Sequence, residues 1–433
     1  MTKKSSLKIQ KREINAWAMF DFANSGYTTV VLTAIYNTFF VGVIAGHLET
    51  GQATLLWTIS ISLANALVLI SAPVLGAITD FSASKKPLLA VTAGGCILAT
   101  AGLAFTGADD IYLAIFLVIL SSFLFFSGEN IIAAFLPEIT SPEHAGRVSA
   151  YGWTIGYVGG LITLGLCLLY IQWAEQQGQT VEQYVPATML IVAAVFAIAV
   201  IPTFVWLKER KIRQNLPEGM NYIQLGWHRL QETLQHARHY QDLFRFLLCL
   251  TIYHCGINTV VVIAAVYAQE VMGFSTQESI MLILVVNISA AFGATIFGFI
   301  QDRFGARNTL MITLLIWCVA TIGAYLVQSS SGFWVIANLV GIALGASQSG
   351  GRALVSTFSP PERSGEFFGL WGLATKLSTI IGPLVFGLIS WITQGDLRTA
   401  LLSTIAFFIL GLILLFTVNE SRGKQAALIN SPT

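Results

Sequence analysis

The stretch GFIQDRFGARN, residues 298–308, decides the fold because a related stretch, GAITDFSASKK, begins at Gly76. Both stretches read glycine, three residues, aspartate and then a cation five positions after the aspartate. Each of them follows a long apolar segment. A pattern that recurs in the same context indicates an internal duplication. We therefore expect the two halves of the chain to share one helical architecture.

The composition is typical of a membrane protein. The chain has 433 residues, of which 55% are hydrophobic and only 10% are charged, whereas a typical soluble domain has about 25% charged residues. A spanning helix needs about 20 predominantly apolar residues, and about twelve windows meet that length. We therefore predict an all-α integral membrane protein with twelve transmembrane helices. The expected spans are residues 14–45, 53–79, 87–107, 111–137, 148–173, 185–207, 243–271, 276–301, 308–328, 332–358, 366–393 and 397–418.

The distribution of positive charges favours one orientation of these spans. Lysine and arginine prefer cytoplasmic loops. In this sequence they gather before the first span, in the even-numbered loops and after the last span. The odd-numbered loops hold only Arg398 and carry acidic residues instead. We therefore expect both termini on the cytoplasmic side, and the short loops favour a bacterial inner membrane.

A second pair of motifs supports the duplication. SPEHAGR, residues 141–147, follows the fourth expected span, and PPERSGE, residues 360–366, follows the tenth. Both contain Pro-Glu-x-x-Gly. Matched motifs in matched loops predict a duplication of six spans, which is a known architecture of secondary transporters.

The longest polar stretch separates the two predicted bundles. We expect an N-terminal six-helix bundle at residues 1–207, a cytoplasmic linker at 208–242 and a C-terminal six-helix bundle at 243–433. Part of the linker has an apolar helical face, which fits an amphipathic helix on the inner leaflet. A disordered linker is the alternative. The residues of that face are Trp227, Leu230, Leu234 and Ala237.

The loop motif resembles a known family signature. Gly298, Asp302, Arg303, Gly305 and Arg307 match the G-x-x-x-D-R-x-G-R signature of the major facilitator superfamily. The first copy departs from that signature at three positions. It keeps Gly76 and Asp80 and has Lys85 in place of the later arginine, but has Phe81 and Ala83 where the signature has arginine and glycine.

The first span resembles one branch of that superfamily. NAWAMFDFANSGY, residues 15–27, is similar to the branch of autophagy-related vacuolar amino-acid effluxers and their bacterial relatives. The resemblance implies two bundles related by a pseudo-twofold axis, with spans one, four, seven and ten lining a central cavity. It also implies that Asp80 and Asp302 hold helix ends together across the cytoplasmic interface in one state of the transport cycle.

Four ionisable residues fall within the expected spans. Asp21 and Glu129 belong to the first half, whereas Arg352 and Lys376 belong to the second half. Charges at membrane depth cost about 2.5–3.5 kcal/mol each, so they face a cavity or pair with one another. We hypothesise that these acids and bases pair across the halves when the cytoplasmic side is closed, as an interdomain gate. Static pairing that only holds helices together is the alternative.

Polar residues in the same spans are candidates for a substrate or proton pathway. They recur at three and four positions in the first span, so they share one helical face. His254 either titrates in proton coupling or is a neutral histidine that is hydrogen-bonded between helices. Because both signs of charge occur, the set suits a zwitterion such as an amino acid. The candidates are Asp21, Asn24, Ser25, Thr28, Glu129, Asn130, His254, Asn258, Gln348 and Ser349.

Several other classes of function are disfavoured. A net charge of +1 gives no basic face for nucleic acid. The sequence contains no G-x-x-x-x-G-K-[ST], H-E-x-x-H or G-x-S-x-G motif, which argues against an enzyme and against a bound cofactor. The five cysteines lack C-x-x-C spacing, so no metal site is expected.

The sequence thus favours a monomeric secondary transporter for a small polar solute in a lipid bilayer. An amino acid is the favoured substrate, efflux the favoured direction, and protons the candidate coupling ion. Two alternatives stay open at this point. In the first alternative, the transporter carries a sugar, a siderophore or a drug-like compound. In the second alternative, the protein is a nontransporting membrane receptor or scaffold.

Overall fold

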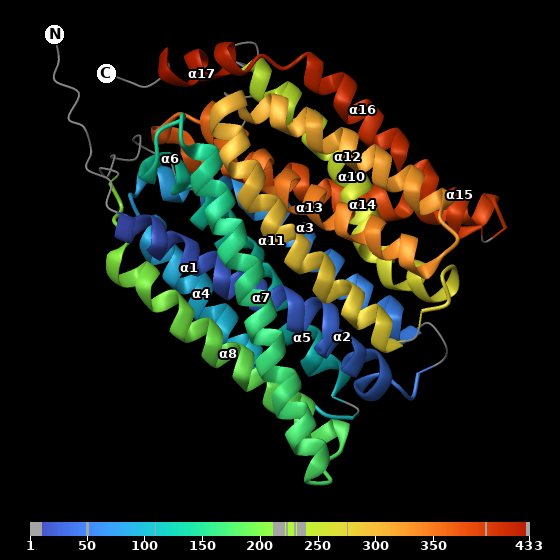
Figure 1. The fold of residues 1–433 in the computed structure, drawn as a ribbon. Helices are drawn as coiled ribbons and strands as arrows, with labels where there is room; N and C mark the ends of the chain where they lie inside the picture. Colours follow the sequence, from blue (N-terminus) through green and yellow to red (C-terminus); the bar gives the residue numbers. More distant parts are fainter. Residues whose placement is uncertain are drawn as a thin grey trace.

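The computed structural model describes residues 11–48, 52–108, 110–210, 221, 224–228, 231, 240–274, 276–394 and 396–429. Every regular element within these residues is a helix (Figure 1). Twelve helical segments in this part of the chain are long and apolar enough to cross a membrane. They confirm the predicted all-α fold with twelve spans, and their limits lie within a few residues of those expected from the sequence.

The first half of the chain contributes six spans. The first span consists of two α-helical and two π-helical segments in alternation. The fourth span continues after a turn into a short helix. In chain order the elements are α1 (Lys11–Tyr27), η1 (Thr28–Ala34), α2 (Tyr36–Phe39) and η2 (Phe40–Ile44), then α3 (Gln52–Phe81), α4 (Lys85–Gly102) with η3 (Leu103–Phe105), α5 (Ile111–Ala133) with α6 (Leu136–Ile139), α7 (Ala145–Gln176) and α8 (Val181–Trp206).

The second half repeats this order and adds a helix after the last span. Its elements are α10 (Gln241–Glu270), α11 (Thr276–Phe304), α12 (Ala306–Leu326), α13 (Ser330–Phe358) with η4 (Pro361–Arg363), α14 (Ser364–Ile392), α15 (Leu397–Ser403) with α16 (Ile405–Phe416), and α17 (Glu420–Ile429). In Figure 1 the first half is blue to green and the second half is yellow to red.

Each half has its own hydrophobic core. One core is built mainly from residues between Trp17 and Leu207, and the other mainly from residues between Tyr240 and Val418. Large apolar side chains also cover the outside of the bundles, as Leu98, Leu169 and Val335 show with exposed fractions of 74%, 65% and 68%. Such an exterior is stable against lipid tails and would be costly in water.

The two halves meet mainly through five long helices. α3 packs against α14, and α7 packs against both α11 and α13. Figure 1 shows α7 alongside α11 where the halves join. In the linker the described residues Gln224–His228 are helical, and Gly226 lies against the backbone of Pro73. Leu230, Leu234 and Ala237 of the predicted amphipathic face lie outside the described residues.

Candidate functional site

An ion pair between Asp21 and Arg352 joins the two halves inside the membrane. Arg352 Nη1 donates to Asp21 Oδ2 over 2.8 Å. Asp21 lies on α1 and Arg352 on α13, and their side chains are only 12% and 4% exposed. The structure therefore brings together one acid and one base of the four that the sequence singled out.

The first half encloses the Arg352 guanidinium on several sides. Its Nε donates to Ser149 Oγ over 3.1 Å, and its Nη2 donates to the Ser149 carbonyl over 2.8 Å. Its Cζ lies 4.6 Å from the ring centroid of Trp17 and 5.2 Å from that of Trp153. Sequence reasoning missed Ser149 and Trp17 as partners, because neither residue type is unusual in a membrane span.

Glycines on α7 make room for this ion pair and for α1. A Cβ atom at Gly152 would overlap Asp21 Oδ2 and lie 2.6 Å from Arg352 Nη2. Gly156 lies against Ser25, whose Oγ would be 2.8 Å from an added Cβ, and Gly160 lies against the same serine. Small residues permit this close helix approach. Ser25 thus packs between α1 and α7, which differs from its expected position on an aqueous path.

Glu129 of the first half and Lys376 of the second half interact electrostatically without forming an ion pair in the part of the chain that the structure describes. Glu129 lies on α5 and is half-buried, and it interacts electrostatically with Lys376 on α14. The Lys376 ammonium lies 3.2 Å from the ring centroid of Phe126. The described residues contain no Glu129–Lys376 ion pair within 4.0 Å. The predicted set of four charges therefore forms one closed pair and one separated pair.

The other polar candidates of the first half are Asn24 and Thr28 on the first span and Asn130 on α5. Asn24 is 7% exposed and its Oδ1 has no hydrogen-bond partner among the described residues. Thr28 is half-buried and donates to the Asn24 carbonyl over 3.2 Å. Asn130 lies against Gly372 of α14, where an added Cβ would be 2.6 Å from Asn130 Oδ1.

The candidates of the second half lie deeper in helix interfaces than expected. Ser349 is fully buried, and its Oγ accepts from Gln301 Nε2 over 2.8 Å. It is therefore part of the contact between α11 and α13 in this structure, and its place on a pathway stays a prediction. Asn258 donates to Ser378 Oγ over 2.9 Å and joins α10 to α14. Gln348 is half-buried.

His254 on α10 is 4% exposed and packs beside the ring of Tyr253, with ring centroids 4.8 Å apart. The contact with Tyr253 lies within α10, and the hydrogen-bonded alternative for His254 stays a prediction. Its part in proton coupling stays a prediction.

The repeated aspartates cap helices of the opposite half. Asp80, at the end of α3, accepts from the backbone N–H groups of Gly365 and Glu366 over 3.0 Å each. Those groups begin α14, where a carboxylate interacts favourably with the helix dipole. Asp302, in the last turn of α11, accepts from the Arg147 N–H over 3.0 Å at the start of α7. The two caps are related by the duplication.

The repeated glycines let these helix ends touch. A Cβ at Gly76 would lie 3.0 Å from the Gly365 carbonyl oxygen. A Cβ at Gly298 would overlap Ala150, and one at Gly146 would lie 2.6 Å from Gln301 Cβ. Each Gly-x-x-x-Asp motif therefore contacts the Pro-Glu-x-x-Gly motif of the other half. The same kind of interface thus occurs at two places, related by the duplication.

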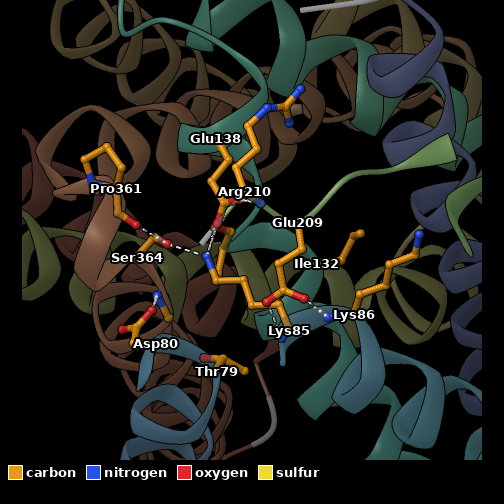
Figure 2. Close-up of polar contacts among 12 residues, drawn as sticks. Thr79, Asp80, Lys85, Lys86, Ile132, Glu138, Glu209, Arg210, Pro361 and Ser364 are labelled. Carbon is orange, nitrogen blue, oxygen red and sulfur yellow. Dashed lines mark hydrogen bonds and ion pairs between the residues drawn. The ribbon is translucent and has the colours of Figure 1, made fainter. Parts of the chain in front are cut away.

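Lys85 has a different environment from its counterpart Arg307. Figure 2 shows the Lys85 ammonium between Glu138 of the first half and Ser364 of the second. It donates to Glu138 Oε1 over 2.5 Å, to Ser364 Oγ over 2.6 Å and to the Ala134 carbonyl over 3.0 Å. The fully buried ammonium is thus satisfied by groups from both halves.

The remaining signature residues hold the ends of the second half. Arg307 donates from Nε to the Leu415 carbonyl over 3.1 Å. Gly305 has φ +85°, in the left-handed region that favours glycine, and the matching Ala83 adopts φ 48°. Arg303 is exposed, and its Cζ lies 5.6 Å from the ring centroid of Phe304. The Arg303 contact lies within its own helix.

Two acids that the sequence did not single out cap α4 and α12. Glu209 accepts from the Lys85 and Lys86 N–H groups over 2.7 and 3.1 Å (Figure 2). Glu420 accepts from the Ala306 and Arg307 N–H groups over 3.3 and 3.0 Å. The sequence could have indicated these acids, because an acid followed closely by an arginine occurs after both the sixth and the twelfth spans.

The two arginines that follow these acids form matching ion pairs in the two halves. We call each acid together with its arginine a brace. Arg210 pairs with Glu13 over 2.5 Å at the start of α1, and Arg422 pairs with Asp242 over 2.6 Å at the start of α10. On the surface, Lys424 Nζ donates to Glu143 Oε1 over 2.6 Å and joins α17 to the first half. This hydrogen bond lowers the pKa of Glu143 to about 2.

The contacts described above join the two halves through an ion pair, helix caps and close approaches of glycines. No cluster of three or more His, Cys, Asp or Glu residues that could hold a metal ion occurs among the described residues.

Comparisons with known proteins agree with this geometry. The family model described as "Vacuole effluxer Atg22 like" matches residues 43–428. The "Uncharacterized MFS-type transporter YxiO" of Bacillus subtilis is 27% identical over 96% of this chain and 97% of that protein. "Autophagy-related protein 22-1" of Aspergillus niger is 23% identical over 65% of this chain, and the match spans about half of that protein, 48%.

Solved structures show the same fold at low sequence identity. The human organic anion transporter MFSD10 has a TM-score of 0.74 and 15% identity, covering 94% of this chain and 99% of that one. A bacterial homologue of the iron transporter ferroportin, in an outward-facing state, has a TM-score of 0.70 and 14% identity, covering 94% and 99%. The chain belongs to the Atg22-like vacuole effluxer family and is a major facilitator superfamily transporter rather than an enzyme.

Proposed function

We propose that this transporter exports a small zwitterionic solute, an amino acid, by rocker-switch alternating access coupled to protons. It works as a monomer in a bacterial inner membrane, with both termini cytoplasmic. In this proposal the contacts between the halves described above close the cytoplasmic side, and their separation opens it.

The separated pair of Glu129 and Lys376 carries the proposal. Asp21 and Arg352 satisfy each other, so neither has a free charge to offer to a ligand. Glu129 is half-buried on α5, and the Lys376 ammonium rests on the Phe126 ring. Because unpaired charges in low dielectric are costly, a ligand that brings one ammonium and one carboxylate would stabilise both residues.

The two charge pairs take different roles in the proposed cycle. Asp21 and Arg352 hold the halves closed at the cytoplasmic side, and their separation permits opening. Glu129 binds the ammonium of the solute or a proton, and Lys376 binds the solute carboxylate. A ligand shifts the equilibrium only through contacts that differ between the two states. Since Glu129 and Lys376 belong to different halves, their distance changes with the rocking motion.

Counterflow in proteoliposomes tests the proposal. Purified protein is reconstituted, the vesicles are loaded with one unlabelled amino acid, and uptake of the radiolabelled form is measured against protein-free vesicles. A neutral, a basic and an acidic amino acid are compared with glucose. We expect amino-acid counterflow above the vesicle background, with no glucose counterflow.

Variants of the separated pair make the test specific. Loss of a charged hydrogen-bond partner costs about 1.5–3 kcal/mol, so Glu129→Gln and Lys376→Met should weaken solute binding about tenfold to a hundredfold. Glu182→Gln and Arg398→Gln change exposed or peripheral charges and serve as controls. Glucose uptake without amino-acid counterflow would favour the sugar alternative, and absence of all flux would favour a nontransporting role.

A further inference from the structure

Close glycine contacts fix the alignment of α14 with α3. A Cβ atom at Gly76 of α3 would lie 3.0 Å from the Gly365 carbonyl oxygen of α14. A Cβ atom at Gly369 of α14 would lie 3.2 Å from the Ala72 carbonyl oxygen of α3. Four residues forward along α14 thus correspond to four residues backward along α3. The two helices are therefore antiparallel and in step where the halves meet.

The same alignment places Asn65 of α3 opposite Lys376 of α14. Lys376 lies seven residues after Gly369, and Asn65 lies seven residues before Ala72. Seven residues are about two helical turns, or about 10 Å, so each side chain returns to the face that carries the contact. Both residues are buried there, since Asn65 is 6% exposed and Lys376 is 7% exposed. Asn65 and Lys376 therefore lie at one level of the interface between the halves.

α5 reaches the same level from its own side. A Cβ atom at Gly372 would lie 2.6 Å from Asn130 Oδ1 of α5. Four residues further along α14, the Lys376 ammonium lies 3.2 Å from the ring centroid of Phe126, which precedes Asn130 by four residues. α5 and α14 are therefore also antiparallel and in step. Two helices of the first half thus bring Phe126 and Asn65 to the level of Lys376.

The side-chain oxygen of Asn65 is a buried acceptor that lacks a donor. Its Oδ1 finds no hydrogen-bond partner within the residues that the structure describes. Buried polar groups in native proteins are nearly always hydrogen-bonded, so an exception needs a reason. Next to a residue of the proposed solute site, an acceptor of this kind suits a hydrogen-bond donor that the solute itself brings.

We infer that Asn65 is a solute-binding residue that accepts a hydrogen bond from a donor on the side chain of the solute. The inference rests on the proposed function, in which Glu129 binds the ammonium of an amino acid and Lys376 binds its carboxylate. Both charged groups of the solute are then engaged, so the donor for Asn65 comes from the side chain. The substrate class is therefore uncharged amino acids that carry a hydroxyl or amide group, such as serine, threonine and glutamine.

The same contact disfavours amino acids with apolar side chains. An apolar side chain at this place would bury the Asn65 oxygen without a donor. A site that is built to hydrogen-bond a hydroxyl discriminates against the analogue that lacks it, because a buried polar group of the site is then left unpaired. Threonine and valine as solutes have almost the same shape and differ in one hydroxyl, so this pair isolates the contact.

Competition in proteoliposomes tests the inference on the wild-type protein. Vesicles are loaded with unlabelled threonine, and uptake of radiolabelled threonine is measured while unlabelled threonine or valine is added outside as a competitor. We expect valine to compete at least about tenfold more weakly than threonine, which corresponds to the loss of one hydrogen bond in a buried site.

Two variants of α3 assign this preference to one residue. Asn65→Leu removes the amide at similar size, so it should weaken threonine binding about tenfold and bring threonine and valine to about equal competition. Ser60→Ala is the matched control. Ser60 is 2% exposed, and its hydroxyl donates to the Leu56 carbonyl of its own helix over 2.7 Å. This control should keep the wild-type preference for threonine.

Two results overturn the inference. They are equal competition by threonine and valine in the wild-type protein, and an unchanged preference for threonine in a folded Asn65→Leu protein. Either result, with amino-acid counterflow present, would leave the proposed function intact. Absence of counterflow for every amino acid would remove the proposed function, and the role of Asn65 with it.

Discussion

Removal of the Arg352 charge should open the proposed gate between the two halves. In the closed state Arg352 on α13 pairs with Asp21 over 2.8 Å and donates twice to Ser149, and both partner residues belong to the first half. Breaking a buried ion pair by removing one partner costs about 3–5 kcal/mol. Because these contacts belong to the closed state, Arg352→Gln should lower the closed-to-open ratio by at least about a hundredfold.

Distances between spin labels report this ratio. Nitroxides at Lys208 and Ser421 would be exposed labels that follow the last spans of the two halves, at the ends that carry the loop motifs. The background protein lacks the five native cysteines. We expect Arg352→Gln to move the distance distribution to longer values, and Asp21→Asn to do the same. Arg398→Gln is the matched control, because Arg398 donates to the Tyr325 and Val327 carbonyls within the second half only.

A double variant separates gating from simple loss of stability. Asp21→Asn together with Arg352→Gln leaves neither member of this pair as an unpaired charge, so its shift should be smaller than the sum of the two single shifts. An unchanged distance distribution in Arg352→Gln, with the protein folded, would refute the gating role of this ion pair. The static-pairing alternative would then be preferred.

Four further predictions follow from the same contacts. Gly152→Ala would place a Cβ 2.5 Å from Trp17 and 2.6 Å from Arg352 Nη2, so spin-label distances should shift toward the open state, and an unshifted distribution would contradict this packing. Ala83→Gly should raise the free energy of unfolding by about 1 kcal/mol, because Ala83 has φ 48°, and Gly305→Ala should lower it; thermal unfolding measures both. Asp80→Asn and Asp302→Asn should each slow transport without unfolding the protein, because each aspartate caps a helix of the other half, and wild-type turnover in both would argue against the reciprocal caps. The hydrogen bond from Lys424 lowers the pKa of Glu143 from 4.5 to about 2. The stability that Glu143 adds relative to Glu143→Gln is therefore fully present above about pH 4.5 and is lost as the pH falls to about 2. Thermal unfolding of both proteins between about pH 2 and 8 should show a constant difference in stability from about pH 5 upward and a shrinking difference below it.

The sequence predicted the helices well because lipid imposes a simple rule on composition and length. Twelve apolar windows became twelve spanning segments. The repeated motifs also indicated which loops correspond, and Asp80 and Asp302 occupy matching caps. Span prediction needs only local hydrophobicity, and the repeat is visible as residue identity at fixed spacing.

Side-chain orientation could not be read from the same periodicity. Ser25 shares a helical face with Asp21 but meets Gly156, because the glycines of α7 leave no room between the helices. Ser349 was expected to line a path and is buried against Gln301. A polar face can point toward a cavity or toward a neighbouring helix, and only tertiary packing decides between them.

Long-range partners of surface charges were also beyond the sequence. Glu209 and Arg210 are adjacent, whereas Glu420 and Arg422 are separated by one residue, so residue spacing conceals that the two sets form equivalent braces. Lys85 matches Arg307 by position, yet its flexible ammonium turns to Glu138 and Ser364. The lysine ammonium lies at the end of a flexible side chain, so its hydrogen-bond partners depend on the groups that tertiary packing places nearby.

Reversible cross-linking of the halves tests alternating access most directly. Thr154 on α7 and Thr295 on α11 have their Oγ1 atoms 2.8 Å apart across the interface, so a cysteine pair at these positions should form a disulfide in the closed state. A pair at Ser289 and Asn338, joined over 2.6 Å within the second half, is the control. We predict that oxidation of the Thr154–Thr295 cysteine pair stops counterflow, that reduction restores it, and that the control pair transports in both conditions. Undiminished counterflow by the fully cross-linked protein would contradict transport by separation of the two halves.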